Sequence, residues 1–312
     1  MRRSLIQLRG RYGHTLPRVT EFRFLPYVVV LLALTFGPRS SARDQASLSS
    51  NSSGTAVADP CSDPSVHAAI KEAFHLVCTK ERVPAAHQAT QEVIVIGFVG
   101  GFVKRNDVKH PEVLFANYLR SRYGSMVHAA VFGNRETKEA LELIHENIGA
   151  NKNGSQALSE HKTVKIILYG HSWGASQVLE FARELEREKI PVSLTIQVDS
   201  VRKMGQDDRS VPANVERAVN FYQSKGLTPG RPVIVAANAD RTQIVGNFHM
   251  TYKHEDINCG NYRWLSRTLN KAHHQIENDP YVWDQIVTLI DSELSGKGRV
   301  EAAQSAARTS EY

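Results

Sequence analysis

Apolar residues follow two different spacings that alternate along the chain from about residue 90 onward. Short continuous runs rich in Val and Ile are typical of strands buried on both faces of a sheet, whereas apolar residues three or four positions apart are typical of helices. The predicted strands cover 92–96, 126–132, 164–169, 192–198, 232–237 and 243–252. The predicted helices begin near Asp63 and then cover 111–122, 136–148, 175–189, 212–222, 262–270 and 280–294. This alternation predicts an α/β fold with a mostly parallel sheet and helices on both faces.

The N-terminal segment has the composition of an export signal. Residues 1–42 carry seven arginines and a single acid, and they include the apolar stretch 24–36 and the small residues 40–42. A basic region, an apolar region and small residues in that order are typical of a cleaved signal peptide. We therefore expect a periplasmic or secreted protein. An uncleaved membrane anchor formed by residues 24–36 is the alternative.

The rest of the chain divides into a linker, one domain and a tail. Residues 43–60 are rich in Ser, Asn, Ala and Gly, which predicts a flexible linker. We expect one domain at 61–295 and a loose tail at 296–312. The leader takes seven of the 38 Lys and Arg and one of the 32 Asp and Glu, so the remaining 31 basic and 31 acidic residues balance. Net charge thus gives no reason to expect a nucleic-acid partner.

Three cysteines are compatible with an oxidising compartment and a single disulfide. Cys61 and Cys78 flank the first predicted helix and are the pair expected to form this disulfide, with Cys259 as the odd thiol. Three buried thiols without a disulfide are the alternative.

The segment Gly170-His171-Ser172-Trp173-Gly174 matches the pattern G-x-S-x-G between a predicted strand and a predicted helix. A strand, a sharp turn and a helix are the context in which this pattern forms a nucleophile elbow, with the serine exposed at its tip. A serine hydroxyl needs a histidine to accept its proton and a carboxylate to orient that histidine. In an α/β sheet enzyme these follow the serine in the order acid, then histidine.

The chain resembles the α/β-hydrolase superfamily of lipases, esterases and thioesterases, including uncharacterised exported bacterial members. The elbow, the segment Ile196–Ser200 and the segment Ala272–Ile276 carry this resemblance, which covers roughly residues 90–295. It implies an α/β-hydrolase fold with few or no large insertions.

The same resemblance suggests partners for Ser172. Members of the superfamily often have a His, two residues, an Ile and then an Asp before the last helix. This spacing favours His273 over the alternative base, His274. For the acid, Asp199 directly ends an apolar run and is favoured over Asp240, which follows the next predicted strand.

An oxyanion hole needs two backbone amides aimed at the developing charge. The residue after the nucleophile, Trp173, supplies one, and Phe98 in the glycine-rich segment after the first strand is the candidate for the second. Val99 is the next candidate. Six aromatic residues are candidates for an acyl pocket: Trp173, Phe98, Phe102, Phe248, Tyr262 and Trp264.

These residues together predict a serine hydrolase of a small carboxylic ester or thioester, lipids included, acting through an acyl-enzyme. We expect no cofactor and no metal, because no H-E-x-x-H or C-x-x-C spacing occurs and the segment 149–160 lacks the first acid of a calcium loop. A catalytically silent scaffold that binds a partner, and a peptidase or amidase with the same triad, are the alternatives.

Overall fold

A computed structural model of the chain describes residues 64–74, 92–149, 164–253 and 257–295, all of which belong to the unit Ala56–Tyr312. The predicted leader, linker and tail, Cys61 and Cys78, and all but the first residue of the calcium-loop-like segment lie outside these residues. Within the described ranges, no helix has both the length and the apolar character needed to span a bilayer.

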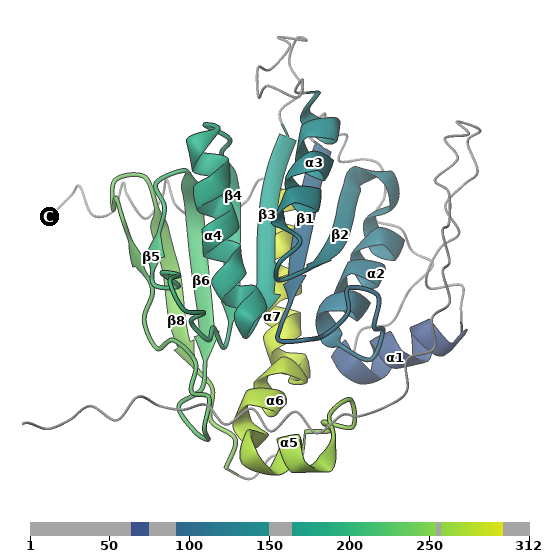
Figure 1. The fold of residues 1–312 in the computed structure, drawn as a ribbon. Helices are drawn as coiled ribbons and strands as arrows, with labels where there is room; N and C mark the ends of the chain where they lie inside the picture. Colours follow the sequence, from purple (N-terminus) through teal and green to yellow (C-terminus); the bar gives the residue numbers. More distant parts are fainter. Residues whose placement is uncertain (1–63, 75–91, 150–163, 254–256, 296–312) are drawn as a thin grey trace, which may run out of the picture. The chain divides into compact units, whose positions relative to one another are not determined.

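Six parallel strands form the main sheet in the order β2-β1-β3-β4-β6-β8 (Figure 1). Their bounds are β1 Glu92–Val99, β2 Val127–Gly133, β3 Val164–His171, β4 Val192–Val198, β6 Val215–Tyr222 and β8 Gln243–His249. The chain leaves β1 in one direction to form β2 and then crosses to the other side to form β3. Open parallel sheets bind ligands at the carboxyl ends of the strands beside such a reversal, which here lies between β1 and β3.

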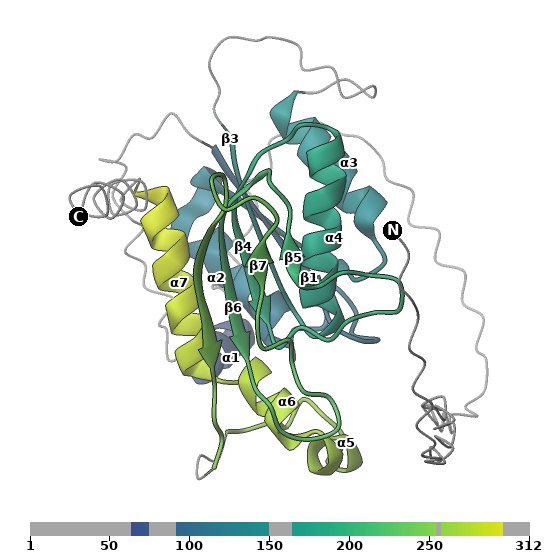
Figure 2. The same ribbon diagram turned by 90° about the vertical axis from the view of Figure 1, so that its left-hand side faces the viewer.

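Helices cover both faces of the sheet (Figures 1 and 2). They are α1 Pro64–Phe74, α2 Pro111–Tyr123, α3 Thr137–Ile148, α4 Trp173–Arg187, α5 Trp264–Leu269, α6 Lys271–Glu277 and α7 Pro280–Leu294, with a 3-10 turn at Gly124–Met126. Val93 and Val95 of β1 pack with α2 and α7, whereas Ile94 and Ile96 pack with α3 and α4. Successive strand residues therefore enter opposite cores, which explains the unbroken apolar runs. The predicted fold class is confirmed.

The prediction of a helix at 212–222 is wrong. This segment forms β6, which lies between β4 and β8, preceded by the short strand β5 Ser210–Val211. Its apolar residues are compatible with either period, and one of its two charged residues, Arg217, is paired with Glu293 of α7 at 2.7 Å. Tertiary contacts thus satisfy polar groups that made the segment look like an amphipathic helix. Of the strand predicted at 232–237, the structure has only the two residues of β7 Val235–Ala236, which pair with β5.

Two smaller differences affect the site. β1 continues to Val99, three residues beyond the predicted end at Ile96. A short helix that the sequence reading did not anticipate, α6, follows α5 and contains His273 and His274.

Candidate active site

Ser172 occupies a tight turn between β3 and α4. Its φ of 58° and ψ of −122° are sterically costly for a residue with a side chain, and the backbone of neighbouring segments lies close on both sides. A Cβ at Gly170 would lie 2.6 Å from the carbonyl carbon of Gly174, and a Cβ at Gly174 would overlap the carbonyl oxygen of Phe98. The Ser172 amide donates to Val198 O at 3.0 Å, which ties the turn to β4. Both glycines are therefore required by close packing.

A chain of hydrogen bonds joins Ser172, His273 and Asp199. His273 Nε2 lies 3.0 Å from Ser172 Oγ, and His273 Nδ1 lies 2.6 Å from Asp199 Oδ2. Ser172 is partly exposed, whereas His273 and Asp199 are buried. The three side chains come from the β3–α4 turn, from α6 and from the end of β4. The imidazole is thereby held between a hydroxyl and a carboxylate, one on each ring nitrogen.

Asp199 is held in place from the neighbouring strand. Gln223, the residue after β6, donates its backbone amide to Asp199 Oδ1 at 3.0 Å and its side-chain amide to Oδ2 at 2.8 Å. The backbone of Asp199 has a φ of 46°, and a Cβ at Gly230 would overlap Oδ1. Sequence reasoning missed Gln223 and Gly230. The sequence predicts a helix at 212–222 in place of the strand that precedes them, and a helix there does not bring Gln223 and Gly230 to the carboxylate.

The two alternative residues lie in other environments. Asp240 is exposed in the turn between β7 and β8, where its amide donates to Asn238 Oδ1 at 3.0 Å. His274 is buried with its Nε2 2.8 Å from Ser266 Oγ, and its ring stacks on Tyr262 with centroids 3.5 Å apart. Of the four candidate partners, the structure thus brings only Asp199 and His273 to Ser172.

The candidate oxyanion donors differ in their placement. Trp173 begins α4, and the first amides of a helix have no acceptor within the helix. Phe98 is a strand residue that pairs with Phe132 on one side and Gly170 on the other, and its side chain packs in the core against Phe181. Contrary to the expectation from sequence, Phe98 is therefore in neither the glycine-rich loop nor the lining of a pocket.

The loop that lies against Ser172 begins at Gly100. A Cβ at Gly100 would lie 3.0 Å from Ser172 Cβ and 2.9 Å from His171 O. Asn134, which follows β2, donates its side-chain amide to Val99 O at 3.2 Å and to Gly101 O at 2.7 Å. Lys203 in turn donates to Asn134 O at 2.7 Å. Asn134 and Lys203 were not among the residues singled out from the sequence, and they anchor this loop beside the nucleophile.

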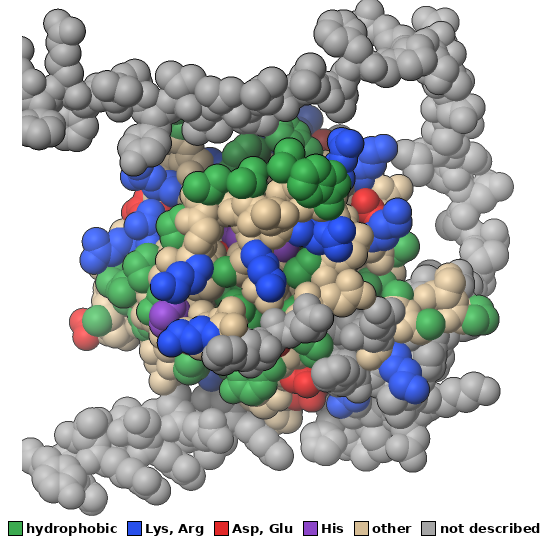
Figure 3. Space-filling view, turned by 90° about the horizontal axis from the view of Figure 1, so that it is seen from below, with side chains coloured by type: hydrophobic (Ala, Val, Ile, Leu, Met, Phe, Trp, Pro, Cys, Tyr) green, Lys and Arg blue, Asp and Glu red, His purple; other side chains and the backbone are tan. Residues whose placement is uncertain are grey.

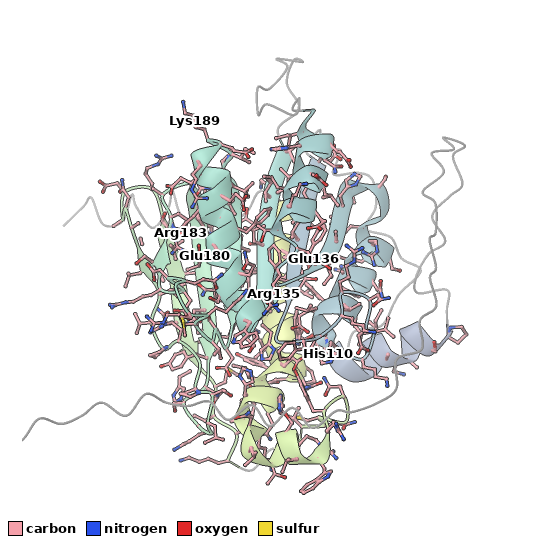
Figure 4. All side chains as sticks on the ribbon, in the orientation of Figure 1. His110, Arg135, Glu136, Glu180, Arg183 and Lys189 are labelled. Atoms are coloured by element: carbon pink, nitrogen blue, oxygen red, sulfur yellow. The ribbon has the colours of Figure 1, made fainter. Side chains whose placement is uncertain are left out.

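A second group of buried ionisable residues lies behind the nucleophile. It consists of His110 and Glu112 at the start of α2, His171 of β3, and Glu277 of α6 (His110 is labelled in Figure 4). Glu277 accepts hydrogen bonds from His110 Nδ1 at 2.8 Å and from Tyr262 OH. His171 Nδ1 lies 3.7 Å from an oxygen of each carboxylate, and its ring lies 4.6 Å from that of His273.

Burial and mutual proximity separate the protonation states of this group. Burial, and then the charge of Glu277, raises the pKa of Glu112 well above its ordinary value. Burial alone would also raise the pKa of Glu277, but the net direction is downward, because a protonated His171 attracts the carboxylate in acid and because His110 and Tyr262 donate hydrogen bonds to it. Burial lowers the pKa of His171 to about 3, so this ring is neutral near pH 7. At neutral pH Glu277 is therefore the ionised carboxyl, and Glu112 is protonated more readily than an exposed acid.

Two buried groups in the described part of the chain have nitrogen and oxygen atoms within 4.8 Å of one another and could in principle hold a metal ion. They are His171 with Asp199 and His273, and His110 with Glu112 and Glu277. In the first group the His273–Asp199 hydrogen bond brings the atoms together, and in the second both oxygens of Glu277 accept hydrogen bonds. Hydrogen bonding therefore accounts for the closeness of His273 to Asp199 and of His110 to Glu277.

No known family model matches this chain, and no curated protein matches it in sequence. Among solved structures, the iodinated complex of an acetyl xylan esterase is similar over 65% of this chain and 98% of that chain, with 13% sequence identity and a TM-score of 0.31. Strand order and register, not this distant similarity, define the fold described above.

Proposed function

We propose that this chain is a serine hydrolase of the α/β-hydrolase superfamily that cleaves a carboxylic ester or thioester through an acyl-enzyme. The observation that carries the proposal is the unbroken hydrogen-bond chain from Asp199 through His273 to Ser172. Its geometry is that of a nucleophile with its general base and the carboxylate that orients the base. Export through the N-terminal segment is part of the same proposal.

In the first half of the reaction, Ser172 Oγ attacks the substrate carbonyl carbon while its proton passes to His273 Nε2, 3.0 Å away. The imidazolium formed in this step is stabilised by Asp199, which accepts from Nδ1 and keeps the ring in the tautomer that can accept at Nε2. The tetrahedral intermediate collapses, the alcohol or thiol leaves with the proton from Nε2, and the acyl group remains on Ser172. Water then attacks the acyl carbon while its proton passes to His273 Nε2. The bond between the acyl carbon and Ser172 Oγ breaks, Nε2 returns the proton to Oγ, and the carboxylic acid leaves.

The negative charge on the carbonyl oxygen needs two amide donors. We assign the first to Trp173, at the start of α4. A strand residue with neighbours on both sides uses its amide in the ladder, so we move the second donor from Phe98 to the loop that begins at Gly100. This loop is close to the Ser172 side chain and is held by Asn134.

The experiment compares Ser172→Ala with Ser176→Ala, using a p-nitrophenyl ester and a fluorophosphonate probe. Ser176 is a matched control, because it is a buried serine one turn further along α4 and is hydrogen-bonded to Gln206. We expect Ser172→Ala to lose hydrolysis and labelling with an unchanged melting temperature, and Ser176→Ala to retain both. Undiminished turnover in Ser172→Ala would overturn the proposal, and a folded wild-type chain that neither reacts nor labels would favour the silent scaffold. Peptide and amide substrates run beside the ester distinguish a peptidase.

A further inference from the structure

Exposed apolar side chains gather at the edge of the sheet where the strands end. Ten large apolar side chains are exposed among the described residues, and seven of them belong to segments that follow the carboxyl ends of β1, β4, β6 and β8. These seven are Phe102, Val108, Met204, Leu227, Trp264, Leu265 and Leu269. Ser172 and His273 lie at the same edge, so the apolar side chains share it with the proposed catalytic residues.

Helix α5 contributes the densest part of this apolar surface. Trp264, Leu265 and Leu269 are 69%, 54% and 50% exposed. The loop that carries Leu227 meets the end of α5, because Thr228 Oγ1 donates to Asn270 Oδ1 at 3.1 Å. Contiguous exposed apolar residues on a soluble fold usually mark a surface that binds a partner or a membrane.

The segments at this edge, together with the one that follows β2, are strongly basic. Their exposed cations are Lys104, Arg105, Lys109, Arg135, Arg202, Lys225, Lys253, Arg263, Arg267 and Lys271. In the described segments 100–109, 134–136, 200–206, 223–231, 250–253 and 257–271, the only acids are Asp107 and Glu136. Both are half-buried, and Glu136 is paired with Arg105 at 3.6 Å. Two acids, Asp207 and Asp208, directly follow the segment 200–206. Asp207 is paired with Arg183, and Asp208 is paired with Arg231.

Figure 3 shows this edge from below, with many Lys and Arg side chains and few Asp or Glu. The charge is local, because basic and acidic residues balance in the chain after residue 42. In Figure 4, Arg135 lies toward this edge, whereas Lys189, which follows α4, lies at the opposite edge. Lys189 therefore lies outside the basic edge.

We infer that this edge docks on an anionic lipid bilayer. Trp264, Leu265 and Leu269 enter the boundary between headgroups and acyl chains, and the surrounding Lys and Arg bind the lipid phosphates. A soluble anion would account for the cations but not for the apolar side chains of α5, whereas an anionic bilayer is complementary to both. The identity of the substrate rests on the proposed function. Given that function, the substrate is an ester lipid in the bilayer.

The position of α5 links docking to the proposed chemistry. Leu269 is followed, after Asn270, by α6, which carries His273. Ser266 of α5 is hydrogen-bonded to His274 at 2.8 Å. A bilayer in contact with α5 therefore lies beside the helix that holds the general base.

The test is co-sedimentation of the full chain with phosphatidylcholine vesicles that contain or lack phosphatidylglycerol. One variant combines Leu227→Ala, Leu265→Ala and Leu269→Ala, and a second combines Arg263→Gln, Arg267→Gln and Lys271→Gln. Exposed residues outside this edge give controls, which are Arg187→Gln with Lys189→Gln and Arg241→Gln for charge, and Val233→Ala for apolar area. The N-terminal segment is identical in all of them, so any binding of its own is constant.

We expect wild type to sediment only with the anionic vesicles. The basic variant should bind roughly 100-fold more weakly at low salt, as about 1 kcal/mol per lost cation predicts, and the apolar variant at least tenfold more weakly. The controls should stay within threefold of wild type. Equal binding to both vesicle types, or equal binding by all variants, would overturn the inference. Hydrolysis of a soluble p-nitrophenyl ester, measured in parallel, reports separately on the proposed function and should be unchanged in both docking variants.

Discussion

Gln223 holds both carboxylate oxygens of Asp199, one through its backbone amide at 3.0 Å and the other through its side-chain amide at 2.8 Å. Asp199 is fully buried, and its Oδ2 also accepts from His273. Gln223, which follows the neighbouring strand, thus orients the carboxylate independently of the imidazole. Hydrogen bonds to a buried charged group contribute more than those between neutral groups.

Replacing the Gln223 side chain should lower turnover without weakening substrate binding. In Gln223→Ala, Asp199 keeps the backbone amide but loses the side-chain donor, so we expect kcat to fall about tenfold to 100-fold with KM unchanged. Steady-state kinetics on a p-nitrophenyl ester measure this, with Gln243→Ala of the exposed β8 residue as control. A rise in KM at constant kcat would assign Gln223 to substrate binding instead.

The two candidate acids should respond very differently to amidation. Asp199→Asn keeps the shape of the side chain but removes the acceptor that selects the His273 tautomer, so kcat should fall by roughly 10⁴. Asp240→Asn changes an exposed turn residue and should leave kcat within twofold of wild type. The measurement is kcat on the same ester, with circular dichroism to verify folding. The reverse ranking would move the acid to Asp240.

Glu277 should be important for stability. Removing its carboxylate in Glu277→Ala leaves the buried His110 and the partly buried Tyr262 without their acceptor, which should cost roughly 3–5 kcal/mol of unfolding free energy. Chemical denaturation provides the value. Glu188→Ala removes a more exposed Glu–His pair, with His145 at 2.5 Å, and should cost under about 1 kcal/mol. Similar losses in the two variants would contradict a special role for the buried group.

Acid should destabilise the fold through its buried neutral histidines. Burial, and then the nearby His273, lowers the pKa of His274 to about 4, below the value of about 6.5 expected in the unfolded chain. The unfolded state therefore takes up the proton first as pH falls, and stability decreases between about pH 6.5 and 4. Each such histidine contributes a slope of up to about 1.4 kcal/mol per pH unit.

His274→Gln tests this dependence. A Gln can still reach Ser266 but does not titrate, so the fall in unfolding free energy between pH 6.5 and 4 should become shallower by up to about 1.4 kcal/mol per pH unit. Denaturant titrations at several pH values measure the slope. His249→Gln, at an exposed position, serves as the control. An unchanged slope in His274→Gln would mean that the ring is not buried in its neutral form.

Much of the fold could be predicted because its strands have simple compositions. The runs in β1, β3 and β4 are almost uninterruptedly buried, so apolar continuity alone identifies them. β6 does not show such continuity, because Arg217 and Asn220 interrupt its apolar residues. Their partners are Glu293, 76 residues away, and the carbonyl of Arg231 on a loop that the sequence did not place. Local patterns do not report such partners.

The sequence by itself determined the elbow at Ser172, since two glycines, a preceding apolar run and a following helix are all local features. It also narrowed the partners to two acids and two histidines. Only the tertiary structure decided which of them meet, because His273 is 101 residues from Ser172 and 74 from Asp199 in the chain. The order of the parallel strands brings their carboxyl ends to one edge, and the contacts of Gln223 and Gly230 then set the direction of the Asp199 carboxylate. Those contacts are packing properties of the assembled sheet, so no local pattern could predict them.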